Sequence, residues 1–542
     1  MTKHPNVLIL FTDQQRYDTI HYAGHEHMIT PNLDRLAEEG CLYRFAHSTN
    51  PVCMPARHDL MTGLSGRAHG YFENGPKPIK DYSIPTLPRI FSENGYRTAA
   101  IGKMHFCPKR MHHGFDEMYL MEELPKSRQI DQYAQFLKEN GLVQLQNIHG
   151  VRPHIYHLPQ NALMEEKYHG STWVADKVIE WLENNQENPF FLIAGWIHPH
   201  PPWGLPPEYQ SLYKEKNIPE PIPLSREFPF RKQKSNWYGD WDTEEEKRNI
   251  RKAYFGAVTM TEHNIGRVLD YLKEKGTIDD TLIIFTSDHG EMLQDKGLYT
   301  KSLPYESSVR IPMIVRYPES FEPGITKDDF VDLFDVLPTC LDVCGLSYAD
   351  DKQKLAGNSL CNEEIVRSRK YQTASFGTGK KRWVMVREER YKYIYWYNGG
   401  TEEMYDMKND PQEINNILRC ENYPLQIYNE LKTRAIEYEK EWGPEECIQN
   451  NNMVELESEL FVVHKGSKFP AGSNSQFQYF DERTPDERGE QFLKEIESAY
   501  YNELSCNKCL NEVNNEKKWR ENFQGNWKKF GGNVKFENKL FK

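Results

Sequence analysis

Short apolar runs recur along this chain and give the first indication of its fold. Residues 6–11 read NVLILF, residues 189–194 read PFFLIA and residues 281–287 read TLIIFTS. Apolar runs of this length, without alternation, are typical of strands that are buried on both faces of a parallel sheet. Residues 96–101 predict a further strand. The pattern therefore predicts a central sheet with helices on both faces.

Segments between these runs have helical periodicity. We expect helices at residues 85–94, 173–184 and 249–273, and the segment 30–37, TPNLDRLA, reads as a capped amphipathic helix. Helices that alternate with buried strands are what a sheet covered on both faces requires.

The pattern changes in the last third of the chain. Residues 383–387 and 392–396 alternate between apolar and polar positions, which predicts a small antiparallel sheet. We expect the chain to divide into residues 1–365, residues 366–450 with the antiparallel sheet, and a C-terminal extension at residues 451–542. The basic, aromatic end of this extension is compatible with an arm of a homo-oligomer or with packing on its own chain.

Composition narrows the class of protein. Among 542 residues, 67 Lys and Arg stand against 80 Asp and Glu, and the net charge of −13 argues against general nucleic-acid binding. It leaves room for a locally basic pocket that binds an anionic ester. The ten cysteines show no disulfide framework, and neither a signal peptide nor a transmembrane run is visible. We expect a cytoplasmic protein with no membrane partner, unless an earlier segment has been removed.

The segment 51–57, PVCMPAR, combines a thiol, a proline and an arginine. Pro55 suits the first position of a helix that ends near Gly63. Cys53 would then lie just outside the helix N-terminus, where N–H groups and the dipole favour an anion. Arg57 is one turn further on and can reach back toward Cys53. Together these features suggest a site for a tetrahedral oxyanion.

Polar residues follow two of the predicted strands directly. Asp13 and Gln14 come after the first run, and Asp288 and His289 come after residues 281–287. Open α/β sheets bind ligands at the carboxyl ends of their strands. Carboxylate and amide oxygens suit a hard divalent cation, and His289 would add a softer nitrogen ligand or contact a bound anion.

Two further pairs carry candidate acid–base chemistry. Alternation in an extended segment would place Lys103 and His105 on one side, where they can bind an oxyanion and move a proton. The other pair, His198 and His200, lies among prolines that hold the segment in a non-helical conformation.

These motifs resemble those of type I sulfatases in the alkaline phosphatase superfamily. CMPAR at 53–57 is similar to the family signature C-x-P-x-R, and GKMHF at 102–106 and SDHGE at 287–291 follow in the family's order. The resemblance covers about residues 5–420 and is closest to bacterial choline-sulfatase-like and carbohydrate sulfatases. It implies an α/β, alkaline-phosphatase-like fold. Its mixed, mostly parallel central sheet would be flanked by helices, with a smaller C-terminal antiparallel sheet.

The resemblance also implies a mechanism. A maturation enzyme would oxidise Cys53 to formylglycine, whose hydrate attacks sulfur. Arg57, Lys103 and Lys301 would neutralise charge with the help of a divalent metal. His200 would assist the leaving alcohol and His105 would deprotonate the second hydroxyl. The implied metal ligands are Asp13, Gln14, Cys53, Asp288 and His289, and the implied substrate contacts are Asn74 and His198.

Calcium is the expected metal by family likeness, with manganese or magnesium as alternatives. The expected substrate is a sulfated saccharide or a small sulfate ester. Two other readings stay open. A phosphonate monoester or phosphodiester hydrolase on the same scaffold is compatible with Gln14 and His289. A non-catalytic binding protein with a degenerate site is disfavoured by the complete residue set.

Overall fold

The computed structural model describes most of the chain up to residue 459. None of the helices among the described residues is long and apolar enough to cross a membrane. The described residues are 4–125, 127–152, 156–223, 243–348 and 353–459, with Glu487, Gln491, Lys494, Glu495, Ser498 and Ala499.

A nine-stranded sheet forms the centre of the molecule, in the order β11-β2-β10-β8-β1-β6-β3-β4, with β9 paired to β2. Its strands are β1 (Asn6–Asp13), β2 (Cys41–His47), β3 (Arg97–Gly102), β4 (Glu117–Leu120), β6 (Phe190–Pro199), β8 (Thr281–Ser287), β9 (Arg310–Ile311), β10 (Met313–Arg316) and β11 (Ile325–Asp332). β1 pairs in parallel with both β6 and β8, while β10 runs antiparallel to its neighbours. The predicted mixed, mostly parallel sheet is thus confirmed.

Strand β1 shows why its sequence is apolar at every position. Val7, Ile9 and Phe11 pack into the core on one face of the sheet, and Leu8 and Leu10 pack into the core on the other. Because side chains alternate between faces, a strand buried on both sides needs an unbroken apolar run.

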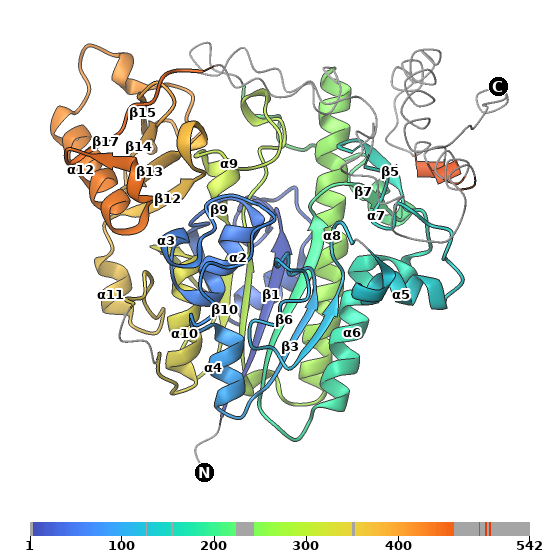
Figure 1. Cartoon of the computed structure of the whole chain (residues 1–542). Helices are drawn as coiled ribbons and strands as arrows, with labels where there is room; N and C mark the ends of the chain where they lie inside the picture. Colours follow the sequence, from blue (N-terminus) through green and yellow to red (C-terminus); the bar gives the residue numbers. More distant parts are fainter. Residues whose placement is uncertain are drawn as a thin grey trace.

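Helices cover both faces, as Figure 1 shows. One face carries α1 (Pro31–Glu38), α6 (Gly170–Asn184) and the long α8 (Glu244–Glu274). The opposite face carries α2 (Cys53–Thr62), α4 (Leu87–Glu93) and α10 (Val336–Val343). Shorter elements are α3 (Gly66–His69), α5 (Gln132–Glu139), α7 (Pro207–Ser211), α9 (Glu306–Val309), α11 (Glu363–Ser368), β5 (Pro159–Asn161) and β7 (Trp203–Leu205).

The small antiparallel sheet is confirmed and has four strands. These are β12 (Gln372–Phe376), β13 (Trp383–Arg387), β14 (Tyr391–Trp396) and β15 (Thr401–Asp406). One face packs on α12 (Leu425–Trp442), and the other packs on Met292, Tyr305 and Val309 of the first part of the chain. In Figure 1 this sheet and α12 lie together beside α9. The short strands β16 (Ile448–Gln449) and β17 (Asn452–Met453) follow.

A few described residues of the C-terminal extension pack on the chain itself. The carboxylate of Glu495 accepts hydrogen bonds from the backbone N–H groups of Gln146, at 2.9 Å, and Asn147, at 3.0 Å. Ala499 is fully buried in the core around α8 and β7. The basic, aromatic end of the extension lies outside the described residues.

Candidate active site

The helix that carries the thiol begins two residues earlier than the sequence suggested. α2 starts at Cys53, with Val52 as its N-cap, and ends at Thr62, where Gly63 is the C-cap with a left-handed φ of 65°. Cys53 is therefore the first helical residue and Pro55 the third. The predicted register was wrong because proline is tolerated throughout the first turn, whose N–H groups need no intrahelical partner.

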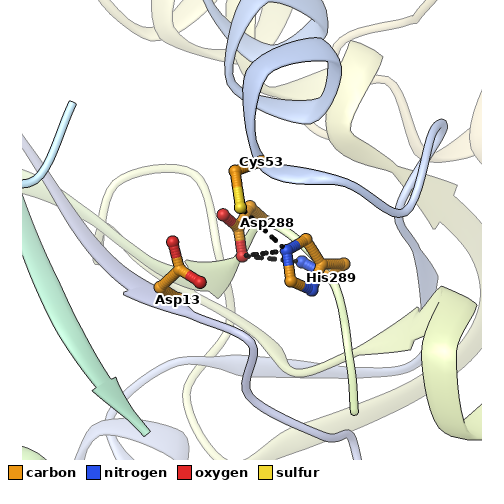
Figure 2. A group of neighbouring side chains, drawn as sticks. All are labelled: Asp13, Cys53, Asp288 and His289. Carbon is orange, nitrogen blue, oxygen red and sulfur yellow. Dashed lines mark hydrogen bonds and ion pairs between the residues drawn. The ribbon is translucent and has the colours of Figure 1, made fainter. Parts of the chain in front are cut away.

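Four buried side chains from three separate segments meet beside this helix start. Asp13 ends β1, Asp288 and His289 follow β8, and Figure 2 shows them turned toward Cys53. One ligand atom of each lies within 4.8 Å of the others. The strand ends converge because β1 and β8 are parallel neighbours.

The donor set of this group fits a cation. His289 Nδ1 lies 2.9 Å from the carbonyl oxygen of Gly290, which only accepts, so Nδ1 carries the hydrogen. Nε2 then carries the lone pair that a metal ion would bind, and it lies 3.3 Å from the Cys53 sulfur and 3.5 Å from Asp288 Oδ1. Asp13 Oδ1 is buried and has no hydrogen-bond partner among the described residues. An unpaired carboxylate oxygen beside a second carboxylate is the environment that a divalent cation stabilises.

Arg57 bridges the two carboxylates, and Lys103 pairs with one of them. Arg57 donates to Asp13 at 2.9 Å and to Asp288 at 3.1 Å, and its other nitrogen donates to the Lys103 carbonyl oxygen at 2.7 Å. The Lys103 ammonium lies 2.7 Å from Asp13. Arg57 thus contacts carboxylates directly, in addition to lying one turn from Cys53.

The two carboxyl groups differ in pKa. Burial raises the pKa of Asp288 to about 6, and the charge of Asp13 adds to the rise. Burial also acts to raise the pKa of Asp13, but Lys103, His200, Arg57 and Lys301 together hold it well below its usual range. Asp13 is therefore the fixed negative charge of the group.

The segment after β3 does not have the extended form that was expected. β3 ends at Gly102, with φ 98°, and His105 has φ 57°, so alternation does not relate Lys103 to His105. Lys103 points to Asp13 and to Glu123, at 2.8 Å. The backbone N–H of His105 donates to Glu122 at 2.9 Å, and within the described chain its Nδ1 is buried without a partner.

His198 and His200 have different surroundings. β6 extends to Pro199, beyond the predicted strand, and carries His198 toward Ser171, 3.4 Å from Nδ1, and the Pro202 carbonyl oxygen, 3.2 Å from Nε2. His200 Nε2 lies 3.7 Å from Glu123. Burial lowers the pKa of both imidazoles, to about 4 for His198, while the Glu123 carboxylate opposes the fall at His200.

Gln14, Lys301 and Asn74 complete the predicted residues. The Lys301 ammonium donates to the Gln14 side-chain oxygen. Burial and Asp13 act to raise the pKa of Cys53, but Lys301 and the other cations hold it well below its usual value, so Lys301 acts on this site. Asn74 Oδ1 accepts from the Met54 N–H at 2.9 Å, in the first turn of α2. In the structure Asn74 therefore caps the helix that carries Cys53.

Two carboxylates were not assigned from the sequence. Glu123 pairs with Lys103 and also with Arg152, at 2.7 Å. It lies in the segment 120–170, which has no motif. Glu291 belongs to the SDHGE motif and contacts Gln14. The sequence signal that could have identified Glu291 was its position, two residues after His289 in the same motif.

Comparisons with known proteins identify several that are similar to this chain. The family model described as Sulfatase matches residues 5–346, and the model for the C-terminal part of N-sulphoglucosamine sulphohydrolase matches residues 294–441. An arylsulfatase of Clostridium perfringens is 30% identical over 470 residues, covering 78% of this chain and 92% of the relative. An N-acetylglucosamine-6-O-sulfatase of Bacteroides thetaiotaomicron is 26% identical, covering 85% and 89%. The crystal structure of a phosphonate monoester hydrolase of Agrobacterium radiobacter has a TM-score of 0.66 at 25% identity, covering 79% and 94%.

Proposed function

The chain belongs to the sulfatase family and is a sulfuric ester hydrolase, and we propose that formylglycine at position 53 is its nucleophile. The observation that carries this proposal is the meeting of Cys53 with Asp13, Asp288 and His289 at the start of α2. A nucleophile there lies beside the cations Arg57 and Lys103, which neutralise charge on a bound sulfate.

We assign the remaining roles to residues that surround this group. One hydroxyl of the hydrated residue 53 gives up its proton to solvent and bonds to sulfur as the S–O ester bond breaks, and His200 gives a proton to the leaving alkoxide. His105 then takes the proton of the second hydroxyl, which expels sulfate and restores the aldehyde for rehydration by water. Lys301 and Arg57 bind sulfate oxygens throughout. Asn74 and His198 remain proposed substrate contacts.

We propose that Asp13, Gln14, Asp288, His289 and residue 53 hold a divalent cation. When bound, the cation stabilises negative charge on the sulfate and the attacking oxygen. The unpaired Asp13 oxygen and the unprotonated His289 Nε2 support this assignment. Calcium is our first choice by family likeness, and the His289 nitrogen keeps manganese and magnesium open.

A sulfated saccharide is the proposed substrate, because a relative that matches 85% of this chain is an N-acetylglucosamine-6-O-sulfatase. A small sulfate ester is the alternative. We also propose a cytoplasmic location, since the eight cysteines of the described chain are free thiols.

Intact-mass analysis tests the nucleophile. Protein made with the maturation enzyme should carry the mass loss of formylglycine at position 53 and hydrolyse 4-nitrophenyl sulfate, and protein made without it should do neither. Cys53→Ala should melt as the wild type does and have no turnover. Full activity of the alanine variant would overturn the proposal.

A second candidate activity is hydrolysis of a phosphonate monoester or phosphodiester. The similarity to the phosphonate monoester hydrolase structure, together with Gln14 and His289 at the site, favours testing it. Parallel rates on 4-nitrophenyl sulfate and bis(4-nitrophenyl) phosphate would separate the two activities. We expect the sulfate ester to have the larger kcat/KM, and the opposite order would make the diester the main substrate.

A further inference from the structure

The carboxylate of Glu291 is buried and accepts hydrogen bonds on both oxygens. Its Oε1 accepts from the N–H groups of Leu293, at 2.9 Å, and Thr300, at 2.5 Å. Its Oε2 accepts from the side-chain amide of Gln14. One side chain thus joins the two ends of the segment 292–300 and contacts a residue at the end of β1.

These partners fix the orientation of the Gln14 amide. A carboxylate only accepts hydrogen bonds and an ammonium only donates them. The NH₂ group of Gln14 must therefore face Glu291, and its oxygen must face Lys301. The reverse orientation would set donor against donor and acceptor against acceptor.

The backbone of Gln14 is also held in place, like its side-chain amide. Its φ of 67° lies in the left-handed region, which a non-glycine residue adopts only when the surroundings enforce it. Its N–H donates to Asp288 Oδ1 at 3.0 Å, and its carbonyl accepts from the Tyr254 hydroxyl at 2.8 Å. The side chain is therefore presented at a fixed place beside Asp13.

We propose that Glu291 is a positioning residue that turns the Gln14 oxygen toward Lys301 and the cation site and closes the segment that presents Lys301. The proposal rests on the proposed function of that site. It explains why the neutral side chain of Gln14 suits this position: a carboxylate there would lie against Glu291, and both charges would be buried.

If Glu291 orients Gln14, each single substitution should disrupt these hydrogen bonds and the paired substitution should restore them. In Glu291→Gln, the new side-chain oxygen must serve Leu293 and Thr300, so its NH₂ faces Gln14. Gln14 must then flip and offer its own NH₂ to Lys301. In Gln14→Glu, two carboxylates meet. In the double variant Gln14→Glu/Glu291→Gln, the new carboxylate accepts from both the new amide and Lys301, and every bond is restored.

The experiment measures Mn²⁺ affinity by titration, kcat and KM on 4-nitrophenyl sulfate, and formylglycine content by mass in each variant. We expect each single variant to lose about tenfold or more in kcat or Mn²⁺ affinity, as for other residues that orient metal ligands. The double variant should recover at least wild-type Mn²⁺ affinity and most of kcat. Glu403→Gln, which alters a buried carboxylate of the small sheet, is the matched control and should change neither.

Recovery in the double variant is an outcome that a merely structural role would not produce. The proposal is overturned if the double variant is no better than the weaker single variant, or if Glu291→Gln keeps wild-type affinity and kcat. If a single variant fails to fold, the double variant still decides the question. If the wild type binds Mn²⁺ but hydrolyses no sulfate ester, the proposed function fails while the affinity comparison still tests Glu291.

Discussion

At the scale of single residues, the end of β6 gives different surroundings to the two histidines for which the family resemblance implied different roles. His200 lies within reach of Glu123, which also pairs with Lys103. His198 faces Ser171 and a backbone carbonyl instead. A proton donor for the leaving group needs a neighbour that favours its protonated form, and of these two histidines only His200 has a carboxylate contact among the described residues.

We therefore predict a leaving-group effect for His200→Ala. An alkyl sulfate releases a strongly basic alkoxide and should slow by about 10²–10⁴, the range of general acid catalysis. A nitrophenyl sulfate, whose leaving group needs no proton, should slow distinctly less. Comparing kcat/KM for both esters checks this, with His198→Ala as the control. Equal losses on both esters would remove His200 from the acid role.

A second prediction concerns the buried acidic pair. Asp13 and Asp288 both form ion pairs with the guanidinium of Arg57, and a divalent cation would further relieve the repulsion between the two carboxylates. We expect chelation to abolish turnover and lower the melting temperature, and added cation to restore both in the wild type. In Asp288→Ala the melting temperature should not respond to the cation. Undiminished turnover of demonstrably metal-free enzyme would contradict the site.

At the scale of elements, α1 is capped by another helix and not by its own N-cap. Thr30 precedes α1, but its hydroxyl bonds the Asp34 side chain at 3.0 Å. Glu262 of α8 accepts from the Asn32 N–H in the first turn of α1, at 2.9 Å. The sequence prediction of a capped helix is correct in position, but the cap comes from 230 residues away. Glu262 therefore joins two helices that cover the same face of the sheet.

This contact predicts a pH dependence of stability. Burial raises the pKa of Glu262 from 4.5 to about 8, so the folded protein holds a proton that the unfolded chain releases. Stability from this group is complete below about pH 4.5 and is lost as the pH rises through 8, by at most about 1.4 kcal/mol per pH unit. Asp34 and the nearby His263 modulate the effect.

Glu262→Gln removes the titrating group and keeps an acceptor for Asn32. The free energy of unfolding of Glu262→Gln, measured in urea between pH 5 and pH 9, should increase relative to that of the wild type as the pH rises. Glu274→Gln, at the exposed end of α8, serves as the control, and its free energy of unfolding should have the same pH dependence as that of the wild type. A constant difference between Glu262→Gln and the wild type would contradict the raised pKa.

At the scale of the whole molecule, buried charges join α9, in the first part of the chain, to the small sheet. Glu306 of α9 accepts from Arg387 of β13 and from Lys392 of β14, the latter at 3.0 Å. Lys392 also lies 2.7 Å from Glu413, which follows β15. The Lys392 side chain is fully buried, so removing it would leave two carboxylates without their shared cation.

We predict that Lys392→Met lowers the free energy of unfolding by about 3–5 kcal/mol, the range for breaking a buried pair. Lys432→Met removes a partly exposed pair with Glu402 and should lower it by about 1 kcal/mol or less. Urea unfolding of both variants checks the contrast. Because this junction lies outside the cation group, neither variant should alter Mn²⁺ affinity. Equal losses of stability would show that the buried network contributes no more than a surface pair.

The sequence by itself determined the apolar strands at the centre of the large sheet, where the helix of Cys53 ends, and which residue types carry the chemistry. The run at 281–287 coincides with β8, and the polar residues after it lie at the site, because apolar patterning and strand-end position are local properties. β2 and β11 were missed. β11 lies at the edge of the sheet and has a largely polar sequence, which gives no strong apolar run.

Only the tertiary structure decided which charges meet. The sheet order brings Asp13 beside residues near 288, and it gives Arg57 two carboxylates as partners. The tertiary structure also decided three further features: the backbone turn at His105, the pairing of Glu123 with Lys103, and the hydrogen bond between Glu291 and Gln14. These contacts join residues that are far apart in the chain, and local patterning carries no information about which distant segments become neighbours. Folding of the sheet sets those distances, and the distances set the pKa values and hydrogen bonds on which the chemistry of the site rests.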